Sequence, residues 1–285
     1  MISNSNETVF QRQPEAPQSE KIILHKNSLS RVMIGFVLMG LAVITVFTLL
    51  HLDSANVQLG EAFHSLRETL TQIFIHPNVG SDSFSMLLSA LGISLLLAII
   101  TTIIGAVIGF FLAIMASRNL TNRYLSAGIR VFMAVVRAIP TIIWVLIFSI
   151  VCGLGTTAAV LGLSFHSVAY LTKAYSESIE EIDQSTIEAL KVTGSKFWVI
   201  VFQAIWPTTM ASLISWTFIR LEINFANAVA VGAAAGAGGI GYQLFVAGNM
   251  SFDFHEVGMI VYMVIAVTFL LEFVAVKLRR VYLAK

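Results

Sequence analysis

Residues 84–117 read FSMLLSALGISLLLAIITTIIGAVIGFFLAIMAS, a run of 34 residues without a charged side chain. Two further charge-free runs cover Val32–Leu52, with 21 residues, and Ala138–Thr172, with 35 residues. A helix needs about 20 consecutive, mostly apolar residues to cross the hydrocarbon core of a bilayer. Three such runs predict an all-α, polytopic membrane protein.

The composition agrees with this class. Of the 285 residues, 57% are hydrophobic and 12% are charged, whereas a soluble domain carries about 25% charged residues. The net charge of +1 gives no reason to expect a nucleic-acid partner. The single cysteine, Cys152, excludes an intrachain disulfide and a cysteine-based metal cluster. The six histidines lack ligand spacing, so neither a metal nor a cofactor is expected.

The apolar runs divide into about six predicted spans. The second is expected to be long and tilted, loosened by Gly92, Gly105 and Gly109, and Pro207 breaks the fifth near its start. Residues 56–76 repeat apolar side chains at helical spacing, which predicts an amphipathic helix at the membrane surface. The predicted spans are Val32–Leu50, Phe84–Ser117, Leu125–Val151, Thr156–Tyr175, Trp198–Ala226 and Val257–Val276.

Charge placement orients these spans. Basic residues near span ends mark the cytoplasmic side, and they cluster before the first span, around Arg118–Arg130 and after the last span. Both termini are therefore predicted to be cytoplasmic. The Gly-rich segment 227–248 is expected to dip in or pack at the outer face without crossing, as a candidate lining of a translocation path. The predicted regions are a polar tail (1–30), a first span with the amphipathic segment (31–83) and a transmembrane core (84–280) with a cytoplasmic loop (176–204).

That loop contains the most informative motif. Residues 176–207 read SESIEEIDQSTIEALKVTGSKFWVIVFQAIWP, in which a short helix over about Ile182–Thr193 is expected to end at Gly194. The spacing of Glu188-Ala189-Leu190, Gly194, Ile205 and Pro207 resembles the cytoplasmic loop of binding-protein-dependent importer permeases. Leu190 and Trp206 depart from that pattern. The resemblance implies that Glu188, Ala189, Leu190, Gly194 and Pro207 form the docking site for an ATP-binding subunit.

Further segments extend the resemblance over roughly Phe84–Arg280 to the permeases of phosphonate importers. These segments are RAIPTIIWVLIF (137–148), YSESIEEID (175–183), RLEINFANA (220–228) and GAGGIG (236–241). The resemblance implies a type I, MetI-like membrane bundle in the cell membrane, which carries a phosphonate or related phosphorus oxyanion. It also implies two ATP-binding subunits, an extracytoplasmic solute-binding protein and a second permease copy or related chain. An amino acid or another oxyanion remains the alternative substrate.

Charges within the predicted spans are candidates for the path. Arg137, Arg220 and Glu222 either hold helices together or line the route of an anion. Arg220 and Glu222 lie about 200° apart on a helix, so Glu222 is expected to pair with Arg137 or with a cation of another protomer. His166 is expected to be a hydrogen-bonded group between helices or, alternatively, a proton relay. Gly236, Gly238, Gly239 and Gly241 are expected to permit close helix packing or to form a flexible gate.

Other functional classes fit less well. Gly236–Gly241 match G-x-G-x-x-G but lack the surrounding strand, helix and acidic residue of a dinucleotide site. No G-x-x-x-x-G-K-[ST] motif is present, so ATP hydrolysis is expected in a partner subunit and this chain is not expected to be an enzyme. An intramembrane enzyme would need paired Asp, a His-Glu-x-x-His helix or a Ser/His arrangement at membrane depth, and none of these is found in the sequence. A stand-alone channel or carrier would not need the motif around Glu188 and Gly194.

Overall fold

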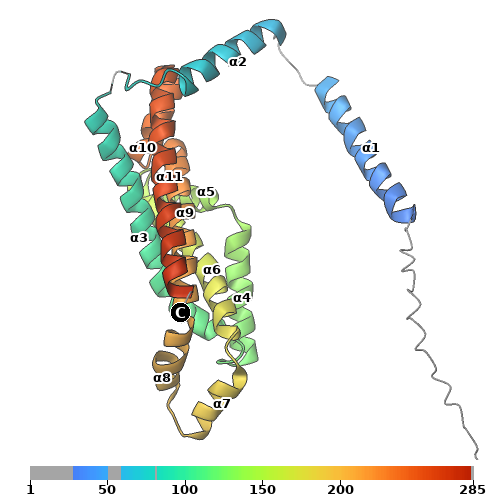
Figure 1. Cartoon of the computed structure of the whole chain (residues 1–285), viewed down its shortest axis with the longest axis vertical. Helices are drawn as coiled ribbons and strands as arrows, with labels where there is room; N and C mark the ends of the chain where they lie inside the picture. Colours follow the sequence, from blue (N-terminus) through green and yellow to red (C-terminus); the bar gives the residue numbers. More distant parts are fainter. Residues whose placement is uncertain (1–27, 51–58, 81, 284–285) are drawn as a thin grey trace, which may run out of the picture. The chain divides into compact units, whose positions relative to one another are not determined.

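The structure is a computed structural model that describes residues 28–50, 59–80 and 82–283 (Figure 1). The chain divides into two compact units, Met1–Leu59 and Gly60–Lys285. In the first unit, α1 (Ser28–Leu50) contains the stretch Val32–Leu49, which is apolar enough to cross a membrane and is wholly exposed. The helix of the predicted first span is confirmed. The predicted polar tail lies outside the described residues except at its end.

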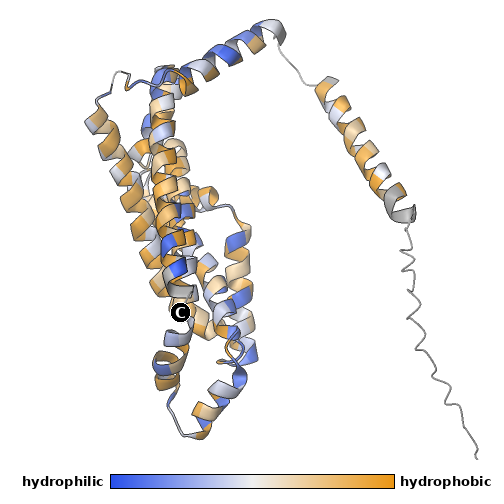
Figure 2. Cartoon of the chain, in the orientation of Figure 1, coloured by the Kyte–Doolittle hydropathy of each residue, from blue (hydrophilic) through white to orange (hydrophobic). Residues whose placement is uncertain are grey.

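The second unit is built from helices and contains no strand among its described residues, as the all-α prediction required. Its elements are α2 (Leu59–Phe74), α3 (Phe84–Ala116), α4 (Arg123–Ala138), α5 (Thr141–Cys152), α6 (Thr156–Glu180), α7 (Gln184–Val192), α8 (Phe197–Ile200), η1 (Val201–Ile205), α9 (Trp206–Ala235), α10 (Gly239–Phe245), η2 (Val246–Met250) and α11 (Phe254–Leu283). Figure 2 shows that α3 and α11 are apolar almost throughout, whereas α2 and α7 are mixed.

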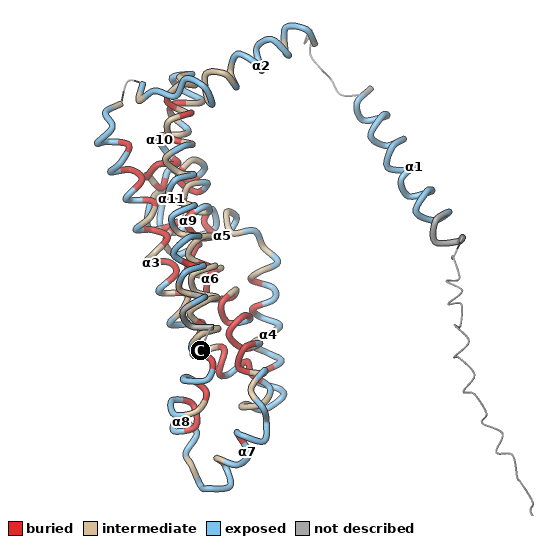
Figure 3. The backbone as a smooth tube through the Cα atoms, viewed as in Figure 1, coloured by how far each residue is buried: buried red, intermediate tan, exposed pale blue. Residues whose placement is uncertain are grey.

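Helices α3, α6 and α9 pack against one another at the centre of this unit, and α4, α5, α10 and α11 pack around them. Figure 3 shows buried residues along α3 and α6, and exposed residues along α2. The buried side chains form several clusters. One lies towards α7 and includes Phe110, Leu171, Ile187 and Ile205; another includes Leu87, Phe225, Ile240 and Ile260.

Helix α3 is continuous over 33 residues. The hydroxyl of its N-cap, Ser83, accepts a hydrogen bond from the Met86 amide at 3.3 Å. Gly105 and Gly109 do not loosen it. A Cβ at Gly105 would lie 2.7 Å from Ser167 Cβ, and one at Gly109 would lie 3.1 Å from Leu171 Cβ. These glycines therefore allow the backbones of α3 and α6 to approach closely.

The predicted third span, Leu125–Val151, is wrong as a continuous helix. Helices α4 and α5 meet at an angle of 90° across Ile139 and Pro140. Proline lacks an amide hydrogen and disfavours helical conformation in the residue before it, so the chain bends here. Helix α5 ends at Cys152, and a turn follows in which Gly153 and Gly155 have φ values of +79° and +135°.

The predicted fifth span continues farther than expected. Phe197–Ala235 is one helical stretch of 39 residues, interrupted only by the π-helical turn η1 before Pro207. A π turn absorbs the register change caused by a proline. Segment 227–248 is therefore mostly helical rather than irregular, because α9 extends to Ala235 and α10 begins at Gly239. Only Gly236–Gly238 forms a break.

Four helical stretches of the described residues are long and apolar enough to cross a membrane, and the bent α4–α5 pair would make a fifth. The remaining predicted span corresponds to α6, which has 25 residues but is less apolar. Its polar side chains are tolerated because much of α6 is buried against α3, α5 and α9. The long stretches besides α1 are Phe84–Ala116, Phe197–Ala235 and Phe254–Leu278.

Candidate functional site

Helix α7 contains the motif that resembles the importer loop. The carboxylate of its N-cap, Asp183, accepts a hydrogen bond from the Ser185 amide at 3.0 Å, and this bond lowers the pKa of that carboxyl. The helix ends at Val192, and Gly194 follows with a φ of +78°. The predicted helix and its glycine stop are therefore confirmed.

The two sides of α7 differ in burial. Ile187 is buried in the core cluster near α6 and α9, and Leu190 packs partly against the same cluster. This contact explains Leu190, which replaces the small residue of the family pattern. Glu188 and Ala189 are exposed, and Glu188 accepts a hydrogen bond from Gln184 Nε2 at 3.1 Å. The exposed side of α7 is therefore available to another protein.

Arg220 lies in a polar network at the centre of the bundle and is only 1% exposed. Its Nε donates to Ser167 Oγ at 3.0 Å, its Nη2 lies 3.1 Å from His166 Nδ1, and its guanidinium lies 5.1 Å from the centre of the Tyr170 ring. His166 is thus a hydrogen-bonded group between α6 and α9, as expected. Among the described residues, Arg220 forms no ion pair with a carboxylate.

Asn224, one turn from Arg220 on α9, extends this network to α3. Its Nδ2 donates to Thr102 Oγ1 at 2.8 Å and to Ser167 Oγ at 2.9 Å. Hydrogen bonds satisfy these buried polar groups, which would otherwise destabilise the fold. The network therefore links the three central helices.

Glu222 does not belong to this network. It is partly buried, and the described part of the chain contains no ion pair between it and Arg137 or Arg220. The predicted pairing with Arg137 is therefore wrong within one chain. The reason is geometric: Arg137 is the penultimate residue of α4 and lines a cavity with Thr172 and Lys173 of α6. A cation of another protomer remains a prediction for Glu222.

The glycines of the Gly-rich segment have two roles, a turn with positive φ and close packing against neighbouring helices. Gly236 and Gly238 have φ values of +60° and +77° and open space around them, so they form the turn after α9. A Cβ at Gly239 would lie 2.3 Å from Ser94 Oγ, and one at Gly241 would clash with the Val229 carbonyl of α9. Close packing is thus shown for Gly239 and Gly241, while a gating role of this segment remains a prediction.

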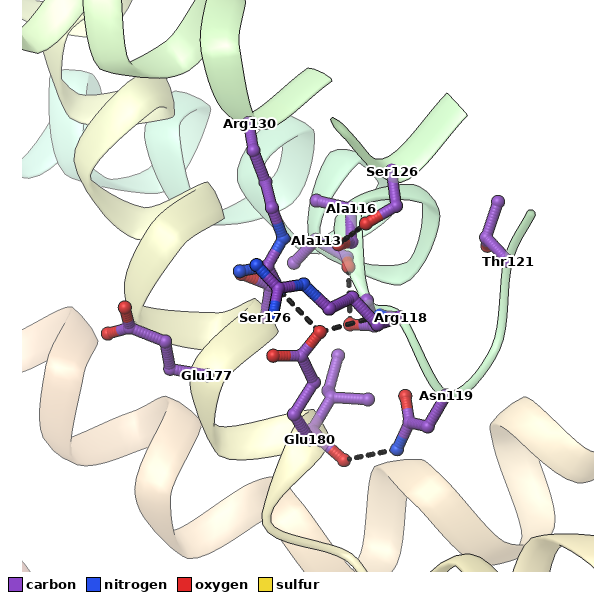
Figure 4. A network of polar contacts seen from close by, with 12 residues as sticks. Ala113, Ala116, Arg118, Asn119, Thr121, Ser126, Arg130, Ser176, Glu177 and Glu180 are labelled. Carbon is purple, nitrogen blue, oxygen red and sulfur yellow. Dashed lines mark hydrogen bonds and ion pairs between the residues drawn. The ribbon is translucent and has the colours of Figure 1, made fainter. Parts of the chain in front are cut away.

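A further polar cluster joins the ends of α3, α4 and α6 (Figure 4). Glu180 forms an ion pair with Arg130 and accepts a hydrogen bond from the Arg118 amide at 2.6 Å. Asn119 Nδ2 donates to the Ile179 carbonyl at 3.0 Å, and Arg130 Nε donates to the Ala116 carbonyl at 2.8 Å. Sequence reasoning used Arg118 and Arg130 only to orient the chain. It did not consider Glu180, which lies far from these arginines in the sequence and contacts them only in the folded chain.

Comparisons with known proteins agree with the motif. The family model described as binding-protein-dependent transport system inner membrane component matches residues 105–282. The chain is 29% identical over 177 residues to the phosphate-import permease protein PhnE of Mycolicibacterium smegmatis, which covers 62% of this chain and 33% of that protein. It is 30% identical over 181 residues to the phosphite transport system permease protein PtxC of Stutzerimonas stutzeri, which covers 63% of this chain and 65% of that protein.

The match therefore spans between a third and just under two thirds of the length of these relatives. Among solved structures, an inward-facing structure of the MetNI methionine ABC transporter contains a chain of similar fold. The TM-score is 0.64 at 20% identity, and the match covers 70% of this chain and 97% of that chain. This likeness supports the membrane-bundle architecture and carries no information on the substrate.

Proposed function

Because this chain belongs to the family of binding-protein-dependent transport system inner membrane components, we propose that it is the permease subunit of an ATP-driven importer. It is a multi-pass membrane protein, and its substrate is a phosphonate or related phosphorus oxyanion. The chain itself performs no catalysis, and the energy comes from ATP hydrolysis in a partner subunit.

The substrate class rests on two kinds of support. Two relatives are named for phosphate import and for phosphite transport, and both of these solutes are phosphorus oxyanions. In this chain, Arg220 places a buried positive charge between α6 and α9 without a carboxylate partner among the described residues. An uncompensated cation of this kind favours an anion over a zwitterion or a neutral solute. Separation of α6 from α9 would give the anion access to Arg220.

The ATP-binding subunit docks on α7. Glu188 and Ala189 are exposed, so they offer the partner a carboxylate and a small side chain. Ile187 is buried and packs α7 against the bundle. A short helix with one buried and one exposed side can seat in a groove of a soluble partner. We propose two ATP-binding subunits, one on this chain and one on a second permease copy or related chain. A solute-binding protein delivers the substrate at the outer face, opposite the cytoplasmic termini.

Transport in proteoliposomes tests the proposal. The chain would be reconstituted with the ATP-binding subunit and solute-binding protein of the same importer, and ATP-dependent uptake of phosphite, a phosphonate and methionine would be compared. We expect uptake of the phosphorus oxyanions alone. Arg220→Gln should lower this uptake at least about tenfold per folded protein, because the buried cation and its charged hydrogen bonds are lost.

Two variants make the test specific. Arg220→Lys keeps the charge and should retain more uptake than Arg220→Gln, whereas the exposed Arg123→Gln should leave uptake unchanged. Uptake of methionine in place of the oxyanions would refute the substrate class. Uptake that is insensitive to Arg220→Gln would remove Arg220 from the transport path.

A further inference from the structure

A small cavity of about 100 Å³ lies between the ends of α3, α4 and α6. It is lined by the basic side chains Arg130, Arg137 and Lys173, the acid Glu177, and the polar or apolar residues Thr172, Ser176, Ala116 and Met133. One water molecule occupies about 30 Å³ in the liquid. The cavity therefore has room for a small ion.

The charges around this cavity do not cancel. Lys173 Nζ lies 3.4 Å from Glu177 Oε1, and Arg130 is paired with Glu180. Arg137 forms no ion pair with any residue that the structure describes. Its Nε is buried and lacks a hydrogen-bond partner in the same described part of the chain. One guanidinium charge thus remains uncompensated in the lining.

Thr172 supplies an independent observation. Its side chain is 1% exposed, and its hydroxyl has no hydrogen-bond partner among the described residues. Other buried threonines of the bundle donate to the carbonyl four residues earlier, as Thr101 does to Leu97 at 2.9 Å and Thr209 does to Ile205 at 2.8 Å. A buried hydroxyl without a partner is destabilising unless a ligand uses it.

We propose that this cavity binds a small inorganic oxyanion, held by Arg137 and Thr172 and supported by Arg130 and Lys173. A guanidinium can donate two parallel hydrogen bonds to an oxyanion such as phosphate, and a hydroxyl can donate a third. Arg137 Nε and the Thr172 hydroxyl, which have no hydrogen-bond partner among the described residues, both belong to residues that line this cavity. Only the identification of this ion with the transported one rests on the proposed function.

The location gives the site a role. The Glu180 network of Figure 4 closes the same end of the bundle, and α6 runs from the cavity towards α7 within a few residues. In the proposed orientation this end faces the cytoplasm. The site therefore lies where a transported oxyanion leaves the bundle, next to the segment that docks the ATP-binding subunit.

Thermal unfolding of the purified full-length chain in detergent tests the binding, with inorganic phosphate as the probe. Phosphate should raise the midpoint temperature, whereas chloride at equal ionic strength should not, because chloride reproduces only charge screening. Arg137→Gln should weaken phosphate binding about tenfold and Thr172→Val about three- to tenfold. Without phosphate, Thr172→Val should be as stable as the parent or more stable, because it removes an unpartnered hydroxyl.

Thr101→Val is the matched control. Thr101 is equally buried, but its hydroxyl already donates within α3, so its removal should leave the affinity for phosphate unchanged. Equal weakening by Thr101→Val and Thr172→Val would overturn the site, as would a phosphate effect that chloride reproduces. Lipid headgroups carry the same phosphate chemistry. Stabilisation by phosphatidylglycerol nanodiscs without any effect of inorganic phosphate would also overturn the proposal.

The two proposals fail separately. Oxyanion uptake without phosphate binding at Thr172 would leave the proposed function standing and remove the site. Thr172-dependent phosphate binding in a chain that imports only methionine would do the reverse.

Discussion

At the scale of single residues, the structure separates charges that the sequence places together. Arg220 and Glu222 are two positions apart on α9. Arg220 points into the central network, and Glu222 lies outside it. Sequence periodicity predicted this separation correctly. It could not predict the partner of either residue, because Ser167, His166 and Tyr170 come from a different helix and show no spacing signal.

Arg137 and Glu222 should behave independently in stability measurements. The described residues contain no ion pair between them, so the destabilisation by Glu222→Gln and by Arg137→Gln should add within about 0.5 kcal/mol in the double variant. Chemical denaturation of the four proteins without phosphate would measure this. A coupling above about 1 kcal/mol would mean that the two side chains meet across a protomer interface.

At the scale of elements, the sequence predicted helices better than their ends. The α7 helix and its glycine stop were predicted from local signals, and both are found, while the N-cap role of Asp183 comes from the structure alone. The 90° bend at Pro140 was missed because α5 is apolar and α4 has an apolar face, so the two helices together are long and apolar enough to pass for one span. The extension of α9 to Ala235 was missed because the segment is also rich in glycine, which disfavours a helix, whereas packing against α10 supports one.

Gly194 should be required for its conformation and not for its size. A Cβ at this position meets nothing within 4 Å, but φ is +78°. Gly194→Val should destabilise the end of α7 by about 1–3 kcal/mol and reduce co-purification of the ATP-binding subunit. Gly194→Asn should be tolerated, because asparagine adopts left-handed conformations. Equal losses in both variants would indicate that a partner contacts the glycine itself.

Two glycines of α3 offer a matched comparison of helix packing. Gly105→Ala places a Cβ 2.7 Å from that of Ser167 and should destabilise the chain by about 1–3 kcal/mol. Gly92→Ala meets nothing within 4 Å and should stabilise it by up to about 1 kcal/mol, because alanine favours helices. Thermal unfolding in detergent would measure both. Destabilisation by Gly92→Ala would point to a contact outside the single chain.

At the scale of the whole molecule, orientation in the membrane is the main prediction that rests on charge alone. The basic clusters predict that Ser185 and Lys285 are cytoplasmic and that Asn249, at the end of η2, is extracytoplasmic. Lys285 lies outside the described residues. The contacts within the bundle are the same for either orientation, so the fold does not decide between them.

Cysteine labelling of intact cells would test this orientation. Cys152 is exposed and must first be replaced by serine. A reagent that cannot cross the membrane should then modify a cysteine at position 249 and leave cysteines at 185 and 285 unmodified. External labelling at 285 would mean an odd number of spans.

The segments on the two sides of α7 are held in different ways. On one side, Glu180 at the end of α6 is held to α4 and to the segment after α3 by its contacts with Arg130 and the Arg118 amide. On the other side, the π turn η1 and Pro207 weaken the regular ladder of helical hydrogen bonds. A force on α7 would therefore displace α7 relative to the end of α6, and the chain would deform mainly at η1, where it enters α9. Under the proposed function, movement of the docked ATP-binding subunit would therefore shift α9, which carries Arg220, relative to α6.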